Sequence, residues 1–297
     1  MREDLLKYRV DEVNGYLDAC LHKLKTNVPK TLLESIKYSL FAGGKRLRPI
    51  LLLESAQIFS DHMENVIPLA CGIEMIHTYS LIHDDLPAMD NDDYRRGKLT
   101  NHNVFGEDMA ILAGDALLNY AYELMIEHAL GLTGKSLTNY LKALFEISAC
   151  SGTQGMIIGQ VADILNQDTT VNKEMLDFIN CHKTGALIKA SVRAGATVHG
   201  CNPEILNHLT KYSEKIGLAF QIVDDVLDVI GDPNKIGKNT GSDEKNNKDT
   251  YIDYYGLQKS KEIIEELLNQ ALQHLKFCNI HDSLLMDLTY FICRRDF

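Results

Sequence analysis

The stretch Thr78-Tyr-Ser-Leu-Ile-His-Asp-Asp-Leu-Pro-Ala-Met-Asp90 carries an apolar helical run into a cluster of acidic residues. The stretch Phe220-Gln-Ile-Val-Asp-Asp-Val-Leu-Asp228 repeats this arrangement later in the chain. Helices that are apolar on most faces are buried in a core, so both stretches predict buried helices that end in carboxylates. Carboxylates packed this closely repel one another, and two such clusters therefore indicate bound cations. Oxygen ligands favour a hard cation such as Mg²⁺, and no histidine and cysteine set has the spacing of a zinc site.

Outward from these two stretches, helical periodicity covers most of the chain and strand-like alternation is absent. We expect helices over residues 5–24, 64–83, 107–130, 136–150, 173–199, 204–230, 257–277 and 281–293. The fold class is therefore predicted to be all-α. The polar stretch 237–250 is too short to link two domains, which predicts one domain over residues 1–297.

Composition narrows the class of protein. The chain has 297 residues, is 45% hydrophobic and carries a net charge of −11, which argues against a nucleic-acid partner. An anionic ligand would have to be captured by local basic groups, because the overall field opposes it. The N-terminus lacks the apolar region of a signal peptide, and no window of about 18 residues is free of polar groups, so no membrane span is expected. Seven cysteines without a CxxC pair fit reduced thiols in a cytoplasmic protein.

The two acid clusters differ in geometry. Asp224 and Asp228 are four residues apart, so a regular helix puts both on one face with Asp225 beside them. Asp84 and Asp90 are six residues apart, about 600° around an ideal helix, which places them on nearly opposite sides. They can share an ion only if the helix stops between them, and Pro87 is the residue that would stop it.

Basic residues suited to phosphate groups lie in separate parts of the chain. They occur in Gly43-Gly-Lys-Arg-Leu-Arg-Pro49, in Arg95-Arg96, in His182-Lys-Thr-Gly185 and at Lys238. Backbone N–H groups at a helix start combine with lysine and arginine to cradle a diphosphate. The first motif is not a P-loop, because its spacing differs. His77, about two helical turns before Asp84, is placed to reach a phosphate. Acid clusters, a hard cation and separate cationic groups together predict diphosphate chemistry.

These motifs occur together, and in the same order, in one known family. They are Gly-Gly-Lys-Arg-Leu-Arg-Pro, Ile-His-Asp-Asp-Leu-Pro-Ala-Met-Asp, Arg-Arg-Gly-Lys, Leu-Ala-Gly-Asp-Ala-Leu-Leu, His-Lys-Thr-Gly and Phe-Gln-Ile-Val-Asp-Asp-Val-Leu-Asp. The chain resembles the trans-polyprenyl diphosphate synthases, most closely the bacterial farnesyl diphosphate synthases, over about residues 35–255. The resemblance implies helices around a deep central cavity, a homodimer and three Mg²⁺ ions. It also implies condensation of isopentenyl diphosphate with dimethylallyl and then geranyl diphosphate, giving the C15 product.

The resemblance also implies residue roles. The Mg²⁺ site would comprise Asp84, Asp85, Asp90 and Asp224, supported by Asp225 and Asp228. The allylic diphosphate would be held by Arg95, Lys183, Thr184, Gln221 and Lys238, of which Arg95, Lys183 and Thr184 are expected to be catalytic. Isopentenyl diphosphate would be held by Lys45, Arg48, His77 and Arg96.

Chain length is expected to depend on Tyr79 and Ser80. Tyr79 lies five residues before Asp84, about 7.5 Å further along the helix axis, where its ring can form a floor for the growing chain. The alternative for Tyr79 is an ordinary core residue, and the alternative product is C20 geranylgeranyl diphosphate. The C-terminal residues 294–297 either close over the isopentenyl site or form a frayed tail.

Two further classes of protein are alternatives to a prenyl diphosphate synthase: a terpene cyclase and a non-catalytic subunit of a heteromeric synthase. A terpene cyclase does not need the Lys45 and Arg48 grip on a second diphosphate. A non-catalytic subunit of a heteromeric synthase would lack intact acid clusters, and both clusters are intact here.

Overall fold

Apolar helical periodicity builds an all-α fold, as the sequence predicts. The computed structural model describes residues 3–24, 28–166, 170–230 and 249–294. Its helices are α1 (Glu3–Leu24), α2 (Lys30–Leu40), α3 (Leu47–Gln57), α4 (Ile67–Asp84), α5 (Asn101–Phe105), α6 (Glu107–Leu130), α7 (Gly134–Ser151), α8 (Met156–Leu165), α9 (Lys173–Ile179), η1 (Asn180–Gly185), α10 (Ala186–Val198), α11 (Pro203–Ile230), α14 (Tyr251–Phe277) and α15 (Leu284–Cys293).

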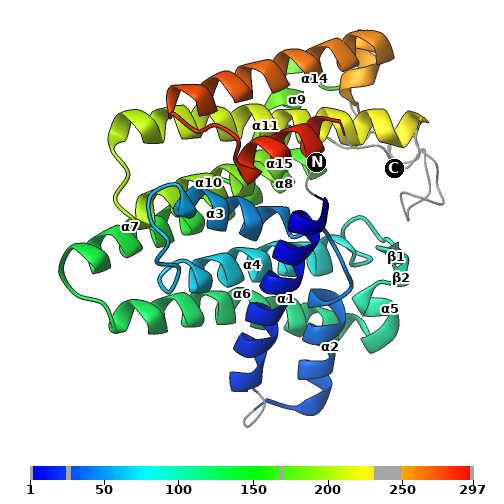
Figure 1. Cartoon of the computed structure of the whole chain (residues 1–297). Helices are drawn as coiled ribbons and strands as arrows, with labels where there is room; N and C mark the ends of the chain where they lie inside the picture. Colours follow the sequence, from blue (N-terminus) through cyan, green and yellow to red (C-terminus); the bar gives the residue numbers. More distant parts are fainter. Residues whose placement is uncertain (1–2, 25–27, 167–169, 231–248, 295–297) are drawn as a thin grey trace.

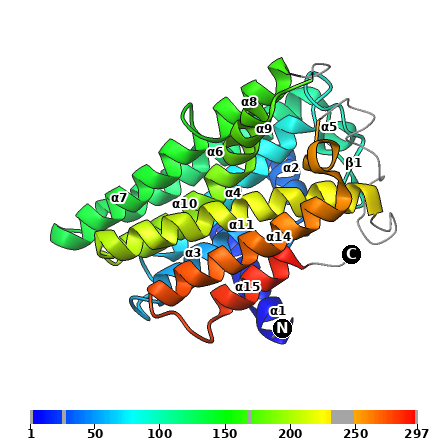
Figure 2. The ribbon, with the colours of Figure 1, turned by 90° about the horizontal axis from the view of Figure 1, so that it is seen from above.

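The long helices pack in layers. Helix α14 lies along α11, α10 lies against α3 and α7, and α4 lies along α6, while α1 and α2 cross these layers steeply (Figure 1). Seen from above, α7, α10, α11 and α14 run alongside one another (Figure 2). Helix α4 is buried on most faces from Leu69 to Ile82, so it forms the centre of the core. The carboxyl-terminal ends of α4 and α11 reach the same end of the bundle (Figure 1).

Several short elements were not expected from the sequence. Helices α2, α3, α5 and α8 are short, so each offers few turns over which periodicity can be detected. The strands β1 (Tyr94–Arg95) and β2 (Lys98–Leu99) pair antiparallel in a small hairpin next to α5. The expected helix over 173–199 consists of α9, η1 and α10, because its middle segment is a π-helix.

One apolar helix, α6, is relevant to the expectation that the chain has no membrane span. Among the residues that the structure describes, α6 alone is long and apolar enough to cross a membrane by length and composition. Core helices of soluble proteins pass the same test, and α6 packs against α2 and α4.

Candidate active site

The first acid cluster forms where α4 stops. The helix ends at Asp84, and the backbone N–H of Asp90 donates to the carbonyl of Asp84 at 2.9 Å. The chain thus turns back around Pro87, which is the break that the spacing requires. Burial raises the pKa of Asp84 to about 6; the charges of Asp90 and Asp85 add to this shift, whereas Lys183 and Arg95 oppose it. Asp84 is therefore a partly buried carboxyl whose ionised form would be stabilised by further positive charge.

Asp85, next to Asp84 in the chain, is already paired with an arginine. It is buried, and one of its carboxylate oxygens accepts from the guanidinium of Arg95 at 2.5 Å. Arg95 lies on β1, so this ion pair fixes the hairpin against the end of α4. A hollow lies beside Arg95 and Arg96, between α2, α4 and the hairpin.

The second acid cluster lies on an unbroken helix. Asp224, Asp225 and Asp228 belong to the last two turns of α11, as the sequence predicts. The buried carboxylate of Asp225 accepts from the backbone N–H of Tyr251 at 3.0 Å. Because Thr250 caps this same end of α14, Asp225 serves to dock the start of α14 on α11.

Lys183 and Thr184 lie in the π-helix η1. The Lys183 ammonium donates to Asp163 at 2.6 Å, and the Thr184 hydroxyl donates to Gln221 at 3.0 Å. Helix α8 approaches this segment closely: a Cβ at Gly159 would lie 2.1 Å from the backbone nitrogen of Lys183. Single π-helical turns within α-helices often mark functional sites. Lys238 lies outside the described residues.

Sequence reasoning missed Asp163. It lies on α8, which is otherwise mostly apolar, and that acid in an apolar helix is the signal that would have found it. Gln160 is on the same helix, and its buried side-chain nitrogen has no hydrogen-bond partner among the described residues. Helix α8 therefore contributes polar groups to the surroundings of Lys183.

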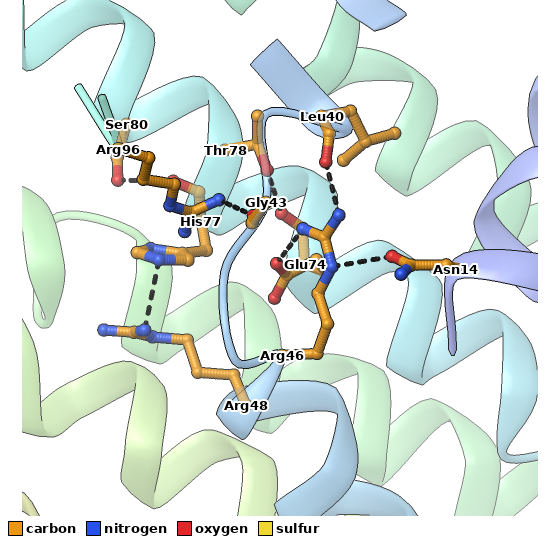
Figure 3. Close-up of polar contacts among 10 residues, drawn as sticks. All are labelled: Asn14, Leu40, Gly43, Arg46, Arg48, Glu74, His77, Thr78, Ser80 and Arg96. Carbon is orange, nitrogen blue, oxygen red and sulfur yellow. Dashed lines mark hydrogen bonds and ion pairs between the residues drawn. The ribbon is translucent and has the colours of Figure 1, made fainter. Parts of the chain in front are cut away.

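The basic loop, residues 43–48, connects α2 to α3. Gly43 and Gly44 have φ angles of 106° and 114°, which side chains rarely allow. The guanidinium of Arg96 donates to the carbonyl of Gly43, and its Cζ lies 2.6 Å from where a Cβ of Gly44 would stand (Figure 3). The positive φ angles favour glycine at both positions, and a Cβ at Gly44 would also displace the end of the Arg96 side chain.

Arg48 brings positive charge into a partly buried place, where it meets His77. Nη1 of Arg48 donates to Nε2 of His77 at 3.2 Å (Figure 3). Burial lowers the pKa of Arg48 to about 10, and Arg96 lowers it further, while Glu74 and Asp224 oppose this. Burial and the charges of Arg48 and Arg96 also hold the pKa of His77 well below its usual range. Nε of Arg48 is buried and lacks a hydrogen-bond partner among the described residues. The cluster is therefore suited to an anion.

Lys45 lies beside the last helix. Its ammonium stands over the ring of Phe291 on α15, 4.9 Å from the ring centre. Arg294, at the end of α15, pairs instead with Glu265 on α14 at 2.7 Å. Residues 295–297 lie outside the described residues. The end of α15 is thus next to the basic loop, but the contact shown by Arg294 is to α14.

Tyr79 and Ser80 lie on the same turn of α4. The Tyr79 ring is buried and meets His83 edge-on at 5.7 Å. Burial raises the pKa of Tyr79 to about 12, and the nearby Tyr122 of α6 and Asp84 add to the shift. The Ser80 hydroxyl donates to the carbonyl of His77 at 2.9 Å. Tyr79 therefore stands between α4 and α6, below the first acid cluster.

The donor chemistry fits a hard divalent ion. Within the described ranges, no three histidine, cysteine or acidic side chains are already gathered around one point. Mg²⁺ commonly binds through one or two protein carboxylates, with waters and substrate phosphates as its other ligands. The raised pKa of Asp84 shows a carboxyl that an added cation would stabilise in its ionised form.

Comparison with known proteins decides the family. The family profile described as polyprenyl synthetase matches residues 29–280. The chain belongs to the polyprenyl synthetase family. This family member is 44% identical to a farnesyl diphosphate synthase of Geobacillus stearothermophilus, over 99% of the chain and 98% of the relative. It is 42% identical to a geranylgeranyl diphosphate synthase of Cyanophora paradoxa, over 99% of the chain and 97% of the relative.

Solved structures agree. A geranyltransferase from Legionella pneumophila superposes with a TM-score of 0.84 at 30% identity, covering 98% of this chain and 97% of that one. The family resemblance and the all-α fold class predicted from the sequence are thereby confirmed. This polyprenyl synthetase is a prenyltransferase of isoprenoid synthesis.

Proposed function

We propose that the chain is a farnesyl diphosphate synthase, which uses Mg²⁺ to join isopentenyl diphosphate first to dimethylallyl and then to geranyl diphosphate. The observation that carries the proposal is the presence of two cation groups on different elements. Lys183 on η1 acts on the partly buried Asp84, whereas Arg48 and Arg96 form a second group at the basic loop, with His77 as the hydrogen-bond partner of Arg48. Two cation groups suit two diphosphates, which a condensation needs and a terpene cyclase does not.

The acidic residues are proposed to hold Mg²⁺. Asp84, Asp90 and Asp224 would be its ligands, with Asp85 and Asp228 beside them. Bound Mg²⁺ would neutralise the diphosphate that leaves the allylic substrate. Asp225 has a supporting role, because it already docks α14.

The allylic diphosphate is assigned to Arg95, Lys183, Thr184, Gln221 and Lys238. Isopentenyl diphosphate is assigned to Lys45, Arg48, His77 and Arg96. In the first group, Lys183 and Thr184 are already held in place by Asp163 and Gln221. Donors that are positioned before the reaction stabilise developing charge without having to reorganise.

The reaction balances without an additional reactant. The C1–O bond of the allylic diphosphate breaks, and its electron pair leaves with the diphosphate. The double bond of isopentenyl diphosphate attacks the allylic cation with its terminal carbon, and a new carbon–carbon bond forms. A neighbouring carbon then loses a proton to the released diphosphate. The apolar wall of α4 and α6 must exclude water, which would otherwise capture the cation.

Product length is proposed to be C15 because of Tyr79. Its buried ring stands below Asp84, between α4 and α6, where a growing chain extending from the diphosphate end would meet it. Ser80 beside it leaves limited space. A C20 product is the second candidate, and a relative 42% identical to this chain bears the name geranylgeranyl diphosphate synthase.

We further propose a cytoplasmic homodimer of single-domain subunits. Helices α6, α7 and α8 carry many exposed apolar side chains, more than isolated surface residues require. They are Ile111, Leu112, Ile126, Leu130, Leu141, Phe145, Ile157, Ile158, Val161, Ile164 and Leu165. Burying them against a second copy would remove this surface from water. Light scattering of the purified protein tests the proposal, and a monomer would contradict it.

One experiment tests the activity. The protein is incubated with isopentenyl and dimethylallyl diphosphates and Mg²⁺, and the dephosphorylated products are separated by chromatography. We expect mainly the C15 alcohol, and no product when a chelator is in excess. A mainly C20 product would overturn the chain-length proposal. Failure to form any prenyl product would overturn the condensation itself and would favour a non-catalytic subunit.

A further inference from the structure

Arg46 differs from the other cations of the basic loop because its side chain points into the protein. Its guanidinium uses all three nitrogens (Figure 3). Nη1 donates to the Glu74 carboxylate at 2.6 Å, Nη2 to the carbonyl of Leu40 at 2.5 Å and Nε to Asn14 at 2.9 Å. The side chains of Arg46 and Glu74 are only 1% and 2% exposed. A diphosphate therefore has no access to Arg46.

The position of Arg46 in the loop gives this contact its consequence. Arg46 has a φ of 50° and is the residue just before α3. Its inward side chain fixes a left-handed turn that an arginine would otherwise adopt rarely. The neighbours point elsewhere: Lys45 stands over Phe291, and Arg48 reaches His77. Anchoring the middle cation thus sets the directions of the two cations that flank it.

Glu74 extends the anchor to α4. It lies one helical turn before His77 and Thr78, and the Thr78 hydroxyl donates to the carbonyl of Glu74 at 2.8 Å. The pair therefore joins four elements: α1 through Asn14, the end of α2 through Leu40, the start of α3 and the middle of α4. His77 is on the same helix as Glu74, and Lys45 and Arg48 flank Arg46 in the chain. The ion pair of Arg46 and Glu74 therefore connects the basic loop to the helix that carries His77.

We propose that Arg46 and Glu74 are positioning residues that aim Lys45, Arg48 and His77 at isopentenyl diphosphate without touching it. This inference rests on the proposed function of the loop. Stability alone does not account for such a pair, because a buried ion pair replaced by apolar residues often leaves stability equal or higher. Directing the loop is a role that apolar residues would not fill.

The test uses a double variant that keeps the net charge of the site unchanged. Arg46→Met with Glu74→Leu removes one positive and one negative charge, so any loss of affinity reflects geometry rather than field strength. We expect the KM for isopentenyl diphosphate to rise about tenfold or more, because small misplacements of positioning groups have large effects. The KM for the allylic substrate and the melting temperature should stay near the wild-type values.

The control is the ion pair of Arg193 on α10 with Glu146 on α7. It joins two helices through two hydrogen bonds of 2.8 and 2.6 Å and lies outside the site. Arg193→Met with Glu146→Leu should leave both Michaelis constants unchanged. If the Arg46 and Glu74 double variant is folded and also has an unchanged isopentenyl KM, the inference is wrong.

Two further measurements keep the test decisive. If the double variant does not fold, Asn14→Ala removes one of the three anchoring bonds, and an unchanged isopentenyl KM in that variant would overturn the inference. Calorimetric titration with inorganic diphosphate compares the same variants without turnover. Wild-type protein that makes no prenyl product would refute the proposed function, whereas weaker diphosphate binding by the double variant would still support the anchor.

Discussion

The acidic region comprises Asp84, Asp85, Asp90 and Asp224, and the basic loop comprises residues 43–48. Both regions place charges of one sign close together, and the sign is opposite in the two regions. Both regions lie near the core, and in each an ion pair joins one member to a group of opposite charge. In the acidic region Arg95 pairs with Asp85, and at the basic loop Glu74 pairs with Arg46. Outside these two ion pairs, the pKa of Asp84 is raised and that of Arg48 is lowered.

The two ion pairs differ in access. Arg95 and Asp85 are 18% and 4% exposed, whereas Arg46 and Glu74 are 1% and 2% exposed. Arg95 can therefore hold its carboxylate and still face a ligand, while Arg46 is confined to the interior. The same residue type therefore offers a ligand very different access at these two positions, and the burial of the side chain sets that access.

The largest expected effect is at the acidic region. Asp84→Ala or Asp224→Ala should lower kcat/KM by about 10³-fold or more, because each removes a group that holds charge at the reacting centre. Steady-state kinetics over a range of Mg²⁺ concentrations measure it. Asp11→Ala, at an exposed position of α1, is the control and should behave as wild type. Near-normal turnover in Asp84→Ala would show that the two regions do not share a reaction.

A smaller effect should separate the two cation groups. Arg48→Met should weaken the binding of isopentenyl diphosphate, and Lys183→Met should weaken the binding of the allylic substrate. Each loss should be about 1.5–3 kcal/mol, as for one charge-assisted contact. Both Michaelis constants are measured for each variant, with Lys142→Ala on the exposed face of α7 as the control. Equal shifts of both constants in both variants would show that the groups form one site.

Substitution of Tyr79 tests whether its ring limits the length of the prenyl chain below the acidic region. Tyr79→Ala removes the buried ring, so products should lengthen from C15 to C20 or beyond while the first condensation is largely retained. Tyr79→Phe keeps the ring and should keep the C15 product. Chromatography of the dephosphorylated products measures both variants. Continued arrest of Tyr79→Ala at C15 would place the floor elsewhere.

The smallest expected effect concerns His77. Its pKa is lowered by burial and by the neighbouring arginines, so bound inorganic diphosphate should raise it by offsetting their charge. NMR titration of the His77 ring, assigned with His77→Gln, measures this. Without a ligand, His77 stays unprotonated in the folded protein at pH values where the histidine of the unfolded chain, with a pKa of about 6.5, takes up a proton. The free energy of unfolding therefore falls as the pH drops below about 6.5. An unchanged pKa with diphosphate would place the anion away from His77.

Much of the site could be predicted from local sequence. Apolar periodicity indicates the long helices, and Pro87 between Asp84 and Asp90 indicates the turn that the structure shows at the end of α4. The four-residue spacing of Asp224 and Asp228 predicts their shared helix face. These inferences succeed because each depends on residues within a few turns of one another. The roles assigned to those residues remain predictions.

Only the tertiary structure decided which charges face one another. The basic motif places Lys45, Arg46 and Arg48 close together in the chain, and it does not show that Arg46 turns inward to Glu74, 28 residues away. Lys183 similarly finds Asp163 across 20 residues, through the close approach of α8 to a π-helix. The physical reason is that helix formation depends on neighbours in the chain, whereas the partner of a buried charge depends on how distant helices dock.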